Sequence, residues 1–314
     1  MADSGLLLPL PQSVEHARSC ALLGVACSEG RIGAAGAERL VWRAQARQIW
    51  GLGAVRLISR GPVAAEEGLL QDWLAGLRGG PMLLNAEGLG AEALRAAGFW
   101  PLLTPATLAL LDLGAAAEMR ARLAQKWRNR LNRAEGLGLV IRRMPLARGH
   151  WLLAAEAAQA RARGYRGLPP AYLEAFAAAN PGRALIWQAE QRQKPVAAIA
   201  VLRHGPMATW QCGVTLPEGR ACHAMTLLLW SAMVWLAERG HTTLDLGILD
   251  SEAAAGLARF KLGTGAAPHR LGGTWLRAQA LVPLARRLPL RMAGGGGRRE
   301  KAGAACAAPA QVSR

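Results

Sequence analysis

The sequence predicts an α/β protein built from two tandem modules, each with a mixed central sheet flanked by helices. The main observation is that one series of elements, strand–helix–strand–helix–strand, occurs twice with similar short connections. The first copy spans residues 54–103 and the second spans residues 207–277. Strands joined by a helical crossover lie parallel in one sheet. The second observation is length, since 314 residues allow two domains of ordinary size.

The first half of the chain supplies the first copy and its flanks. Ser13 is the expected N-cap of a helix over 13–23, and the alternating run at 38–48 predicts a strand. The first series then consists of strand 54–59, helix 66–77, strand 81–85, helix 91–97 and a strand near 99–103. A further extended segment is expected at 108–113.

The middle of the chain contains its most basic element, a helix over 115–138. A buried stripe at helical spacing is formed by Met119, Leu123, Trp127, Leu131 and Ala134, and basic residues take the other faces. After it we expect a strand at 139–143, helices at 150–163 and 171–179, and paired strands at 185–189 and 196–202. The second series follows as strand 207–215, helix 221–239, strand 242–247, helix 253–260 and strand 270–277.

These elements divide the chain into two domains and a tail. We place a supporting N-terminal domain at 1–117 and a catalytic C-terminal domain at 118–291, which opens with a basic linking helix at 118–135. The segment 292–314 is rich in glycine, alanine and arginine and is expected to be disordered.

Composition limits the classes of function. The net charge is +17, and 34 of the 38 basic residues are arginine. The charge has two interpretations: a solvated basic surface, or attraction to polyanions such as tRNA, coenzyme A or lipid head groups.

The five cysteines form no C-x-x-C pair, so neither a disulfide framework nor a metal site is predicted. The N-terminus lacks the features of a signal peptide. The longest apolar window, 221–237, is short for a membrane span, so we expect a cytoplasmic soluble protein.

The turn after strand 207–215 is the first candidate site. Gly219, Arg220 and Ala221 stand where a long helix is expected to begin, and free amides at helix N-termini bind phosphate. We therefore predict donor-phosphate binding here. The alternative is an ordinary strand-to-helix turn.

The segment FKLGTG is a sharper candidate. Lys261 follows Phe260 and precedes Gly263 and Gly265, two glycines that would let a ligand approach the backbone. A lysine here can hold a phosphate or carboxylate as a point charge. The alternative is a lysine that only stabilises the C-terminus of a helix.

Other polar residues complete the predicted substrate site. Arg161 and Tyr165 are four residues apart and are expected to share one helix face, where arginine can bind a carboxylate. Asp245, near the end of a strand, is a candidate to orient an amine or act as a base, although such residues more often cap the next helix. Substrate contacts are also predicted for Trp210, Cys212 and His223.

Two segments carry a family resemblance. KWRNRLNRAEGLGL (126–139) and LARFKLGTG (257–265) resemble the Fem-type branch of the GNAT superfamily, which contains the peptidoglycan-bridge aminoacyltransferases and related acetyltransferase domains. The resemblance covers about residues 40–278. It implies two GNAT-like domains and a substrate site containing Arg161, Tyr165 and Lys261. The sequence departs from the family in its degenerate glycine loop and in lacking the coiled-coil insertion of some tRNA-dependent members.

The resemblance implies an N-acyltransferase that moves an acyl or aminoacyl group onto a small-molecule or peptide amine. Acyl-CoA or aminoacyl-tRNA would be the co-substrate, with no permanently bound cofactor. Lys126, Arg130 and Arg133 are candidates for a polyanion-binding face toward tRNA. The alternative is a non-catalytic basic module that binds nucleic acid or a membrane surface. The donor, the acceptor and the oligomeric state are left open by the sequence.

Overall fold

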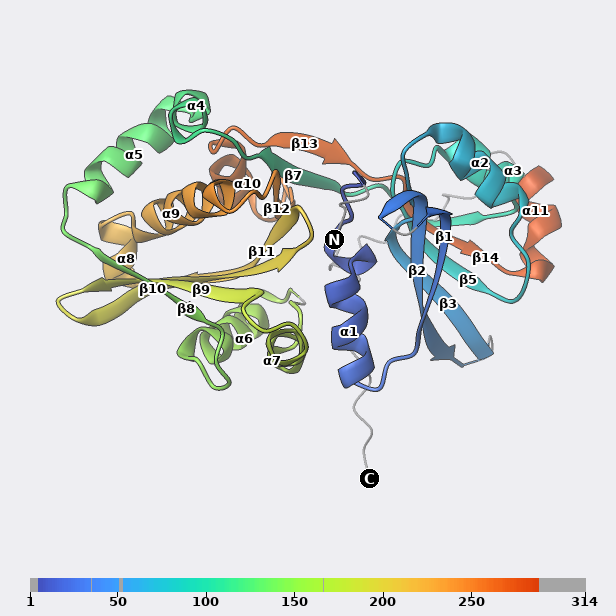
Figure 1. Ribbon diagram of the computed structural model, residues 1–314, viewed down its shortest axis with the longest axis horizontal. Helices are drawn as coiled ribbons and strands as arrows, with labels where there is room; N and C mark the ends of the chain where they lie inside the picture. Colours follow the sequence, from blue (N-terminus) through green and yellow to red (C-terminus); the bar gives the residue numbers. More distant parts are fainter. Residues whose placement is uncertain (1–4, 35, 51–52, 166, 288–314) are drawn as a thin grey trace. The chain divides into compact units, whose positions relative to one another are not determined.

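The computed structural model describes residues 5–287 except 35, 51–52 and 166 (Figure 1). They form two compact units: unit 1 runs to Ala106 and resumes at Arg270, and unit 2 is Thr107–His269. This division corrects the expected one at both ends of the second domain. The strand expected at 108–113 belongs to unit 2, and the strand expected at 270–277 mainly serves unit 1. The predicted tail, 292–314, lies outside the described residues.

Unit 1 is a seven-stranded sheet with helices on both faces. Its elements are η1 (Leu10–Gln12), α1 (Val14–Leu22), β1 (Cys27–Ala34), β2 (Ala37–Ile49), β3 (Gly53–Gly61), β4 (Val63–Ala64), α2 (Glu67–Ala75), β5 (Met82–Ala86), α3 (Ala91–Ala96), β6 (Trp100–Leu103), β14 (Gly273–Arg277), η2 (Gln279–Leu281) and α11 (Val282–Arg287). The strand order is β1-β2-β3-β5-β14-β6, with β4 beside β2. The predicted parallel crossover is confirmed, because β3 and β5 pair in parallel. The sequence did not predict β1, whose mostly exposed side chains give no hydrophobic alternation.

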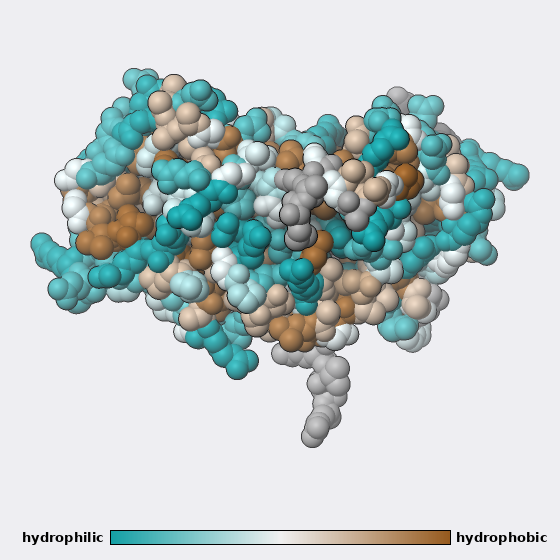
Figure 2. Space-filling model, viewed as in Figure 1, coloured by the Kyte–Doolittle hydropathy of each residue, from teal (hydrophilic) through white to brown (hydrophobic). Residues whose placement is uncertain are grey.

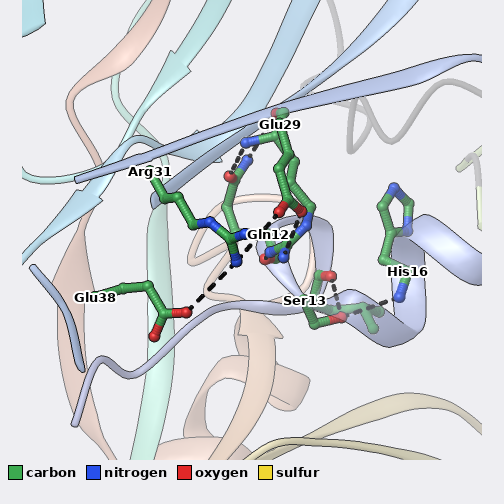
Figure 3. Close-up of polar contacts among 8 residues, drawn as sticks. Gln12, Ser13, His16, Glu29, Arg31 and Glu38 are labelled. Atoms are coloured by element: carbon green, nitrogen blue, oxygen red, sulfur yellow. Dashed lines mark hydrogen bonds and ion pairs between the residues drawn. The ribbon is translucent and has the colours of Figure 1, made fainter. Parts of the chain in front are cut away.

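The two faces of β2 hold unit 1 together in different ways. Leu40 and Ala44 belong to the apolar cluster that includes Trp73 of α2. On the other face, Gln12 donates to the carbonyl of Ser59 at 2.8 Å, and its side-chain oxygen accepts from the amide of Arg43 at 2.6 Å. Figure 3 shows Gln12 beside Glu29 and Arg31 of β1. These polar side chains tie η1 to the sheet.

Unit 2 is also a seven-stranded sheet. Its elements are β7 (Thr107–Asp112), α4 (Ala116–Arg122), α5 (Gln125–Glu135), β8 (Val140–Pro145), α6 (Trp151–Arg163), α7 (Pro170–Ala179), β9 (Ala184–Gln191), β10 (Lys194–His204), β11 (Met207–Thr215), α8 (Pro217–Ala221), α9 (Ala224–Glu238), β12 (Thr243–Ile248), α10 (Ala255–Leu262) and β13 (Ala267–Arg270). The strand order is β13-β7-β12-β11-β10-β9-β8. Figure 1 shows α9 over one face of this sheet and α6 and α7 over the other.

The basic helix that the sequence predicts as continuous is broken in unit 2. The basic helix divides at Leu123 and Ala124, whose backbones are extended. The amide of Ala124 instead donates to the carbonyl of Gly263 at 2.9 Å, which joins this break to the end of α10. The long apolar helix expected at 221–239 begins at Ala224 instead, because His223, with a left-handed φ of 54°, separates it from α8.

The two sheets share one topology, which confirms the predicted duplication. In unit 1 the strands β1, β2 and β3 are antiparallel, β3 pairs with β5 in parallel, and β14 lies between β5 and β6. In unit 2 the strands β9, β10 and β11 repeat this order, β11 pairs with β12 in parallel, and β7 lies between β12 and β13. In each sheet the inserted strand comes from a distant part of the chain. The second series is therefore not continuous in space, because its last strand, β14, belongs to the other sheet.

Candidate active site

The parallel strands of unit 2 separate after a short paired stretch. Only Met207, Ala208 and Thr209 of β11 have partners in β12, which are residues 243–245. Where β11 leaves β12 it also bulges against β10, since Ala200 and Val201 pair with Cys212 and Trp210 and leave Gln211 as the extra residue. A bulge bends its strand and redirects its side chains. This geometry opens a space at the carboxyl ends of two parallel strands.

A cavity of about 390 Å³ occupies this opening. It is lined by residues of α6, β11, α8, the start of α9, β12 and α10. Its basic side chains are Arg163, Arg220 and Lys261, and Glu156 is the one carboxylate among its lining residues. The excess of positive charge favours an anionic ligand.

Lys261 is the most buried charged group of the cavity, with 6% of its surface exposed. Its ammonium donates to the carbonyl of Ile248 at 2.8 Å and lies 6.0 Å from the ring centroid of Trp210. Burial lowers the pKa of Lys261 to about 8, and nearby Asp245 acts in the opposite direction. The charged and neutral forms are therefore closer in free energy than for an exposed lysine.

Asp245 accepts a hydrogen bond from the backbone of β12 close to Lys261. Its side chain is buried, and Oδ1 accepts from the amide of Gly247 at 2.7 Å. Gly247 has a left-handed φ of 78°, and a Cβ placed there would lie 3.6 Å from the Lys261 ammonium. Asp245 is not among the residues that line the cavity. It therefore positions the bend of β12 that faces Lys261, and the structure does not place it against a substrate amine.

Phe260 links the two sequence segments that carry the family resemblance. Its ring centroid lies 5.8 Å from that of Trp127 in α5 and 6.1 Å from that of Trp210 in β11. A Cβ at Gly263 would lie 2.8 Å from the Trp127 side chain, and one at Gly265 would lie 3.1 Å from Arg122. The prediction that these glycines admit a ligand is therefore wrong. They allow α4 and α5 to pack against the end of α10.

Tyr165 lies at the cavity, but with a different partner from the one predicted. Its hydroxyl donates to Glu156 Oε1 at 2.7 Å and accepts from the Gln159 amide at 3.0 Å. Burial, followed by the hydrogen bond to Glu156, raises the pKa of Tyr165 to about 12. Arg161 does not share a helix face with it, because α6 ends at Arg163 and the chain turns at Gly164. Arg161 is exposed and does not line the cavity.

Glu156 and Arg163 are the charged cavity residues that sequence reasoning missed. Burial raises the pKa of Glu156, against the opposing effect of hydrogen bonds from Tyr165 and Gln159. One signal was available, because Glu156 is the single acidic residue in the alanine-rich helix α6. Arg163 could not be distinguished from Arg161 until the end of the helix was known.

The turn after β11 does not form the predicted phosphate loop. α8 has five residues and contains Pro217, which has no amide hydrogen. A Cβ at Gly219 would lie 2.3 Å from the carbonyl oxygen of Val196, so this glycine is needed for packing against β10. Ala221 is exposed at the end of α8. Of the three predicted phosphate-binding residues, only Arg220 lines the cavity.

Of the three remaining predicted contacts, two line the cavity and one does not. Trp210 and Cys212 line the cavity, and burial raises the pKa of the Cys212 thiol to about 12. His223 does not line it. Burial lowers the pKa of His223, with further lowering by Arg130 and Arg133 of α5.

The predicted polyanion-binding residues lie on the outer face of α5. Lys126, Arg130 and Arg133 are exposed, whereas Trp127 and Leu131 are buried in the core as the helical stripe predicts. Figure 2 shows mainly hydrophilic side chains over α5.

Within the described residues, no group of histidine, cysteine and acidic side chains could hold a metal ion. No helix in the described ranges is long and apolar enough to cross a membrane.

Comparisons with known proteins identify a matching domain model and similar folds. Residues 117–270 match the family model of an acetyltransferase (GNAT) domain. The structure superposes on the crystal structure of FemX with a TM-score of 0.70 and 14% sequence identity, covering 90% of this chain and 96% of that one. A conserved protein of unknown function from Bacteroides thetaiotaomicron matches with a TM-score of 0.55 and 12% identity, covering 86% and 90% of the two chains. No curated protein matches the sequence.

Proposed function

We propose that this chain, whose residues 117–270 match a GNAT domain model and whose fold is similar to that of FemX, is a Fem-type acyltransferase that transfers an acyl or aminoacyl group from an activated donor to an amine within the unit 2 cavity. The observation that carries the proposal is the buried ammonium of Lys261 beside the opening between β11 and β12. The match of residues 117–270 to a GNAT domain model supports acyl transfer in general.

The proposed reaction is direct attack of a neutral amine on the ester or thioester carbonyl of the donor. Negative charge develops on the carbonyl oxygen, and the Lys261 ammonium together with backbone amides of the bulged β11 stabilises it. Glu156 accepts the proton that the amine loses, a role favoured by its raised pKa. Glu156 then gives this proton to the alcohol or thiol of the donor as it leaves. Because burial raises the pKa of Cys212 to about 12, its thiol stays protonated and is not the nucleophile.

Aminoacyl-tRNA is the donor that the local geometry favours. The turn after β11 contains Pro217 and a buried Gly219, so it offers few free amides to a coenzyme A pyrophosphate. The exposed face of Lys126, Arg130 and Arg133 suits a phosphate backbone. Acyl-CoA is the second candidate donor, favoured by the match to an acetyltransferase domain model. Both donors place the activity in the cytoplasm.

A turnover assay with purified protein tests the proposal. Acetyl-CoA and a mixture of charged tRNAs would each be supplied with a panel of small amines and short peptides, and amide product would be followed by mass spectrometry. Transfer from either donor that is lost in Lys261→Met supports the proposal. The exposed lysine of β10 provides a matched control, Lys194→Met, which should retain activity.

The competing function is a non-catalytic polyanion-binding module. In that case neither donor is consumed, and nucleic acid binding would weaken with salt and survive Lys261→Met. Binding of tRNA that instead depends on Lys126, Arg130 and Arg133, combined with transfer that depends on Lys261, would favour the aminoacyl-tRNA reaction.

A further inference from the structure

A second cleft of about 270 Å³ lies between α6 and α7. Its walls are Leu153, Ala157 and Ala160 of α6, Leu173 of α7, and the turn of residues 167–170 that joins the two helices. All these side chains are apolar, and the turn contributes glycine, leucine and two prolines. For scale, an apolar cavity of about 150 Å³ holds benzene. The cleft is large enough for a side chain the size of leucine or phenylalanine.

Glu156 borders both this cleft and the cavity that contains Lys261. It is the one charged residue that lines the apolar cleft. Its carboxylate is held by two neutral donors, the Tyr165 hydroxyl at 2.7 Å and the Gln159 amide at 3.2 Å. A carboxylate has about four acceptor positions. The two hydrogen bonds therefore fix its orientation and leave capacity for a further donor.

Charge indicates which ligand group belongs at this boundary. The other charged residues of the Lys261 cavity are basic, and they disfavour an ammonium group everywhere except beside Glu156. An ammonium at Glu156 would also stabilise the ionised carboxylate, which its partial burial disfavours. Glu156 lines both the apolar cleft and the Lys261 cavity. A ligand that binds Glu156 through its amine and fills the cleft must therefore carry its apolar group close to that amine.

We infer that the acceptor is a primary amine with a compact apolar group one or two bonds from the nitrogen, such as the α-amine of a leucine-like residue. The ammonium binds Glu156, and the apolar group fills the cleft between α6 and α7. The ammonium loses one proton to solvent before attack, and Glu156 accepts the second proton as the amide forms. This inference rests on the proposed acyl transfer, since it names the acceptor for the same cavity.

Binding measured without any donor tests the inference. Leucinamide, glycinamide and 4-methylpentanamide would be titrated into the full-length protein by calorimetry. Glycinamide lacks the apolar group, and 4-methylpentanamide lacks the amine. Burying an isobutyl group and pairing an ammonium should each strengthen binding, so leucinamide is expected to bind about tenfold more tightly than either analogue.

Variants on α6 make the test specific. Ala160→Leu places a larger side chain in the cleft and should reduce leucinamide binding to the level of glycinamide. Ala158→Leu, at an exposed position of the same helix outside the cleft, is the matched control and should bind like wild type. Glu156→Gln should remove the advantage of leucinamide over 4-methylpentanamide. Circular dichroism would verify that each variant retains its fold.

Three results would overturn the inference. They are no detectable leucinamide binding at millimolar concentration, equal affinity for leucinamide and glycinamide, and equal affinity for leucinamide and 4-methylpentanamide. Failure here leaves acyl transfer to other amines intact, because no donor is present. Conversely, a protein that binds leucinamide as expected but consumes neither donor would refute the proposed reaction alone.

Discussion

Units 1 and 2 have the same strand order, but their parallel strand pairs end differently. In unit 1, β3 and β5 stay paired from Arg56 opposite Met82 to Gly61 opposite Ala86. In unit 2, β11 and β12 pair over three residues only and then separate. The cavity with Lys261 lies at that separation. The shared fold therefore supplies the location for a site, and the parting of the two parallel strands creates it.

The polar side chains near these parallel strands also differ between the two units. In unit 1, Asn85 accepts a hydrogen bond from Thr274 at 2.9 Å, and Gln12 reaches the carbonyl of Ser59. Each of these side chains is hydrogen-bonded within unit 1. In unit 2, Gly247 instead leaves room for Lys261, whose ammonium faces the open cavity. The sequence predicts a supporting role for unit 1, and that role stays a prediction.

The largest loss of activity should come from removing the charge of Lys261, where β11 and β12 separate. Lys261→Met is expected to lower transfer by about 100- to 1000-fold, as loss of an oxyanion-stabilising donor does in other enzymes. The near-isosteric side chain should keep unit 2 folded. Turnover and circular dichroism of the variant and of Lys194→Met would be compared. Full activity in Lys261→Met would remove the basis for placing the chemistry at this cavity.

Unit 1 should lose stability in acid because of His16. Burial, together with Arg43 and Arg47, lowers the pKa of His16 from 6.5 to about 4. The folded state therefore binds fewer protons than the unfolded state between pH 6.5 and 4, and its stability falls as pH falls through this window. The loss should approach about 3 kcal/mol. Urea unfolding of wild type and His16→Gln at several pH values measures it, and equal pH slopes would contradict the assignment.

A methyl group at the packing contact of α8 should destabilise unit 2. Gly219→Ala places Cβ 2.3 Å from the Val196 carbonyl oxygen, and overpacking of this kind costs about 1–3 kcal/mol. Gly256→Ala is the matched helical control, since no atom lies within 4 Å of its added Cβ. It should be neutral or slightly stabilising. If thermal unfolding shows equal effects for both variants, Gly219 is not a packing glycine.

The smallest effect should be found at the bend of β12. Gly247→Ala and Gly205→Ala both put alanine into a left-handed backbone, at φ values of 78° and 50°, which costs about 1–2 kcal/mol each. Only Gly247 has the Lys261 ammonium nearby. Both variants should lose similar stability, but only Gly247→Ala should lose transfer, by about fivefold to tenfold. Equal activity of the two would show that the bend does not position Lys261.

Local sequence patterns determined most elements and several of the residues that line the cavity, among them Lys261. The stripe Met119, Leu123, Trp127, Leu131 and Ala134 was identified because a helix repeats its buried positions every 3.6 residues. The parallel crossovers could be predicted because a helix between two strands constrains their direction. Lys261 stood out as a rare lysine in an arginine-rich chain. Each of these inferences needs only residues that are close together in the sequence.

The tertiary structure decided everything that depends on distant contacts. β14 joins the sheet of unit 1 and β7 that of unit 2, and nothing local specifies either partner. Gly219, Gly263 and Gly265 were interpreted as ligand contacts, but atoms of other elements occupy the space beside them. Glu156 becomes a site residue only because α6 places it at the opening of β11 and β12. Periodicity is a property of neighbouring residues, whereas a cavity depends on which remote segments meet.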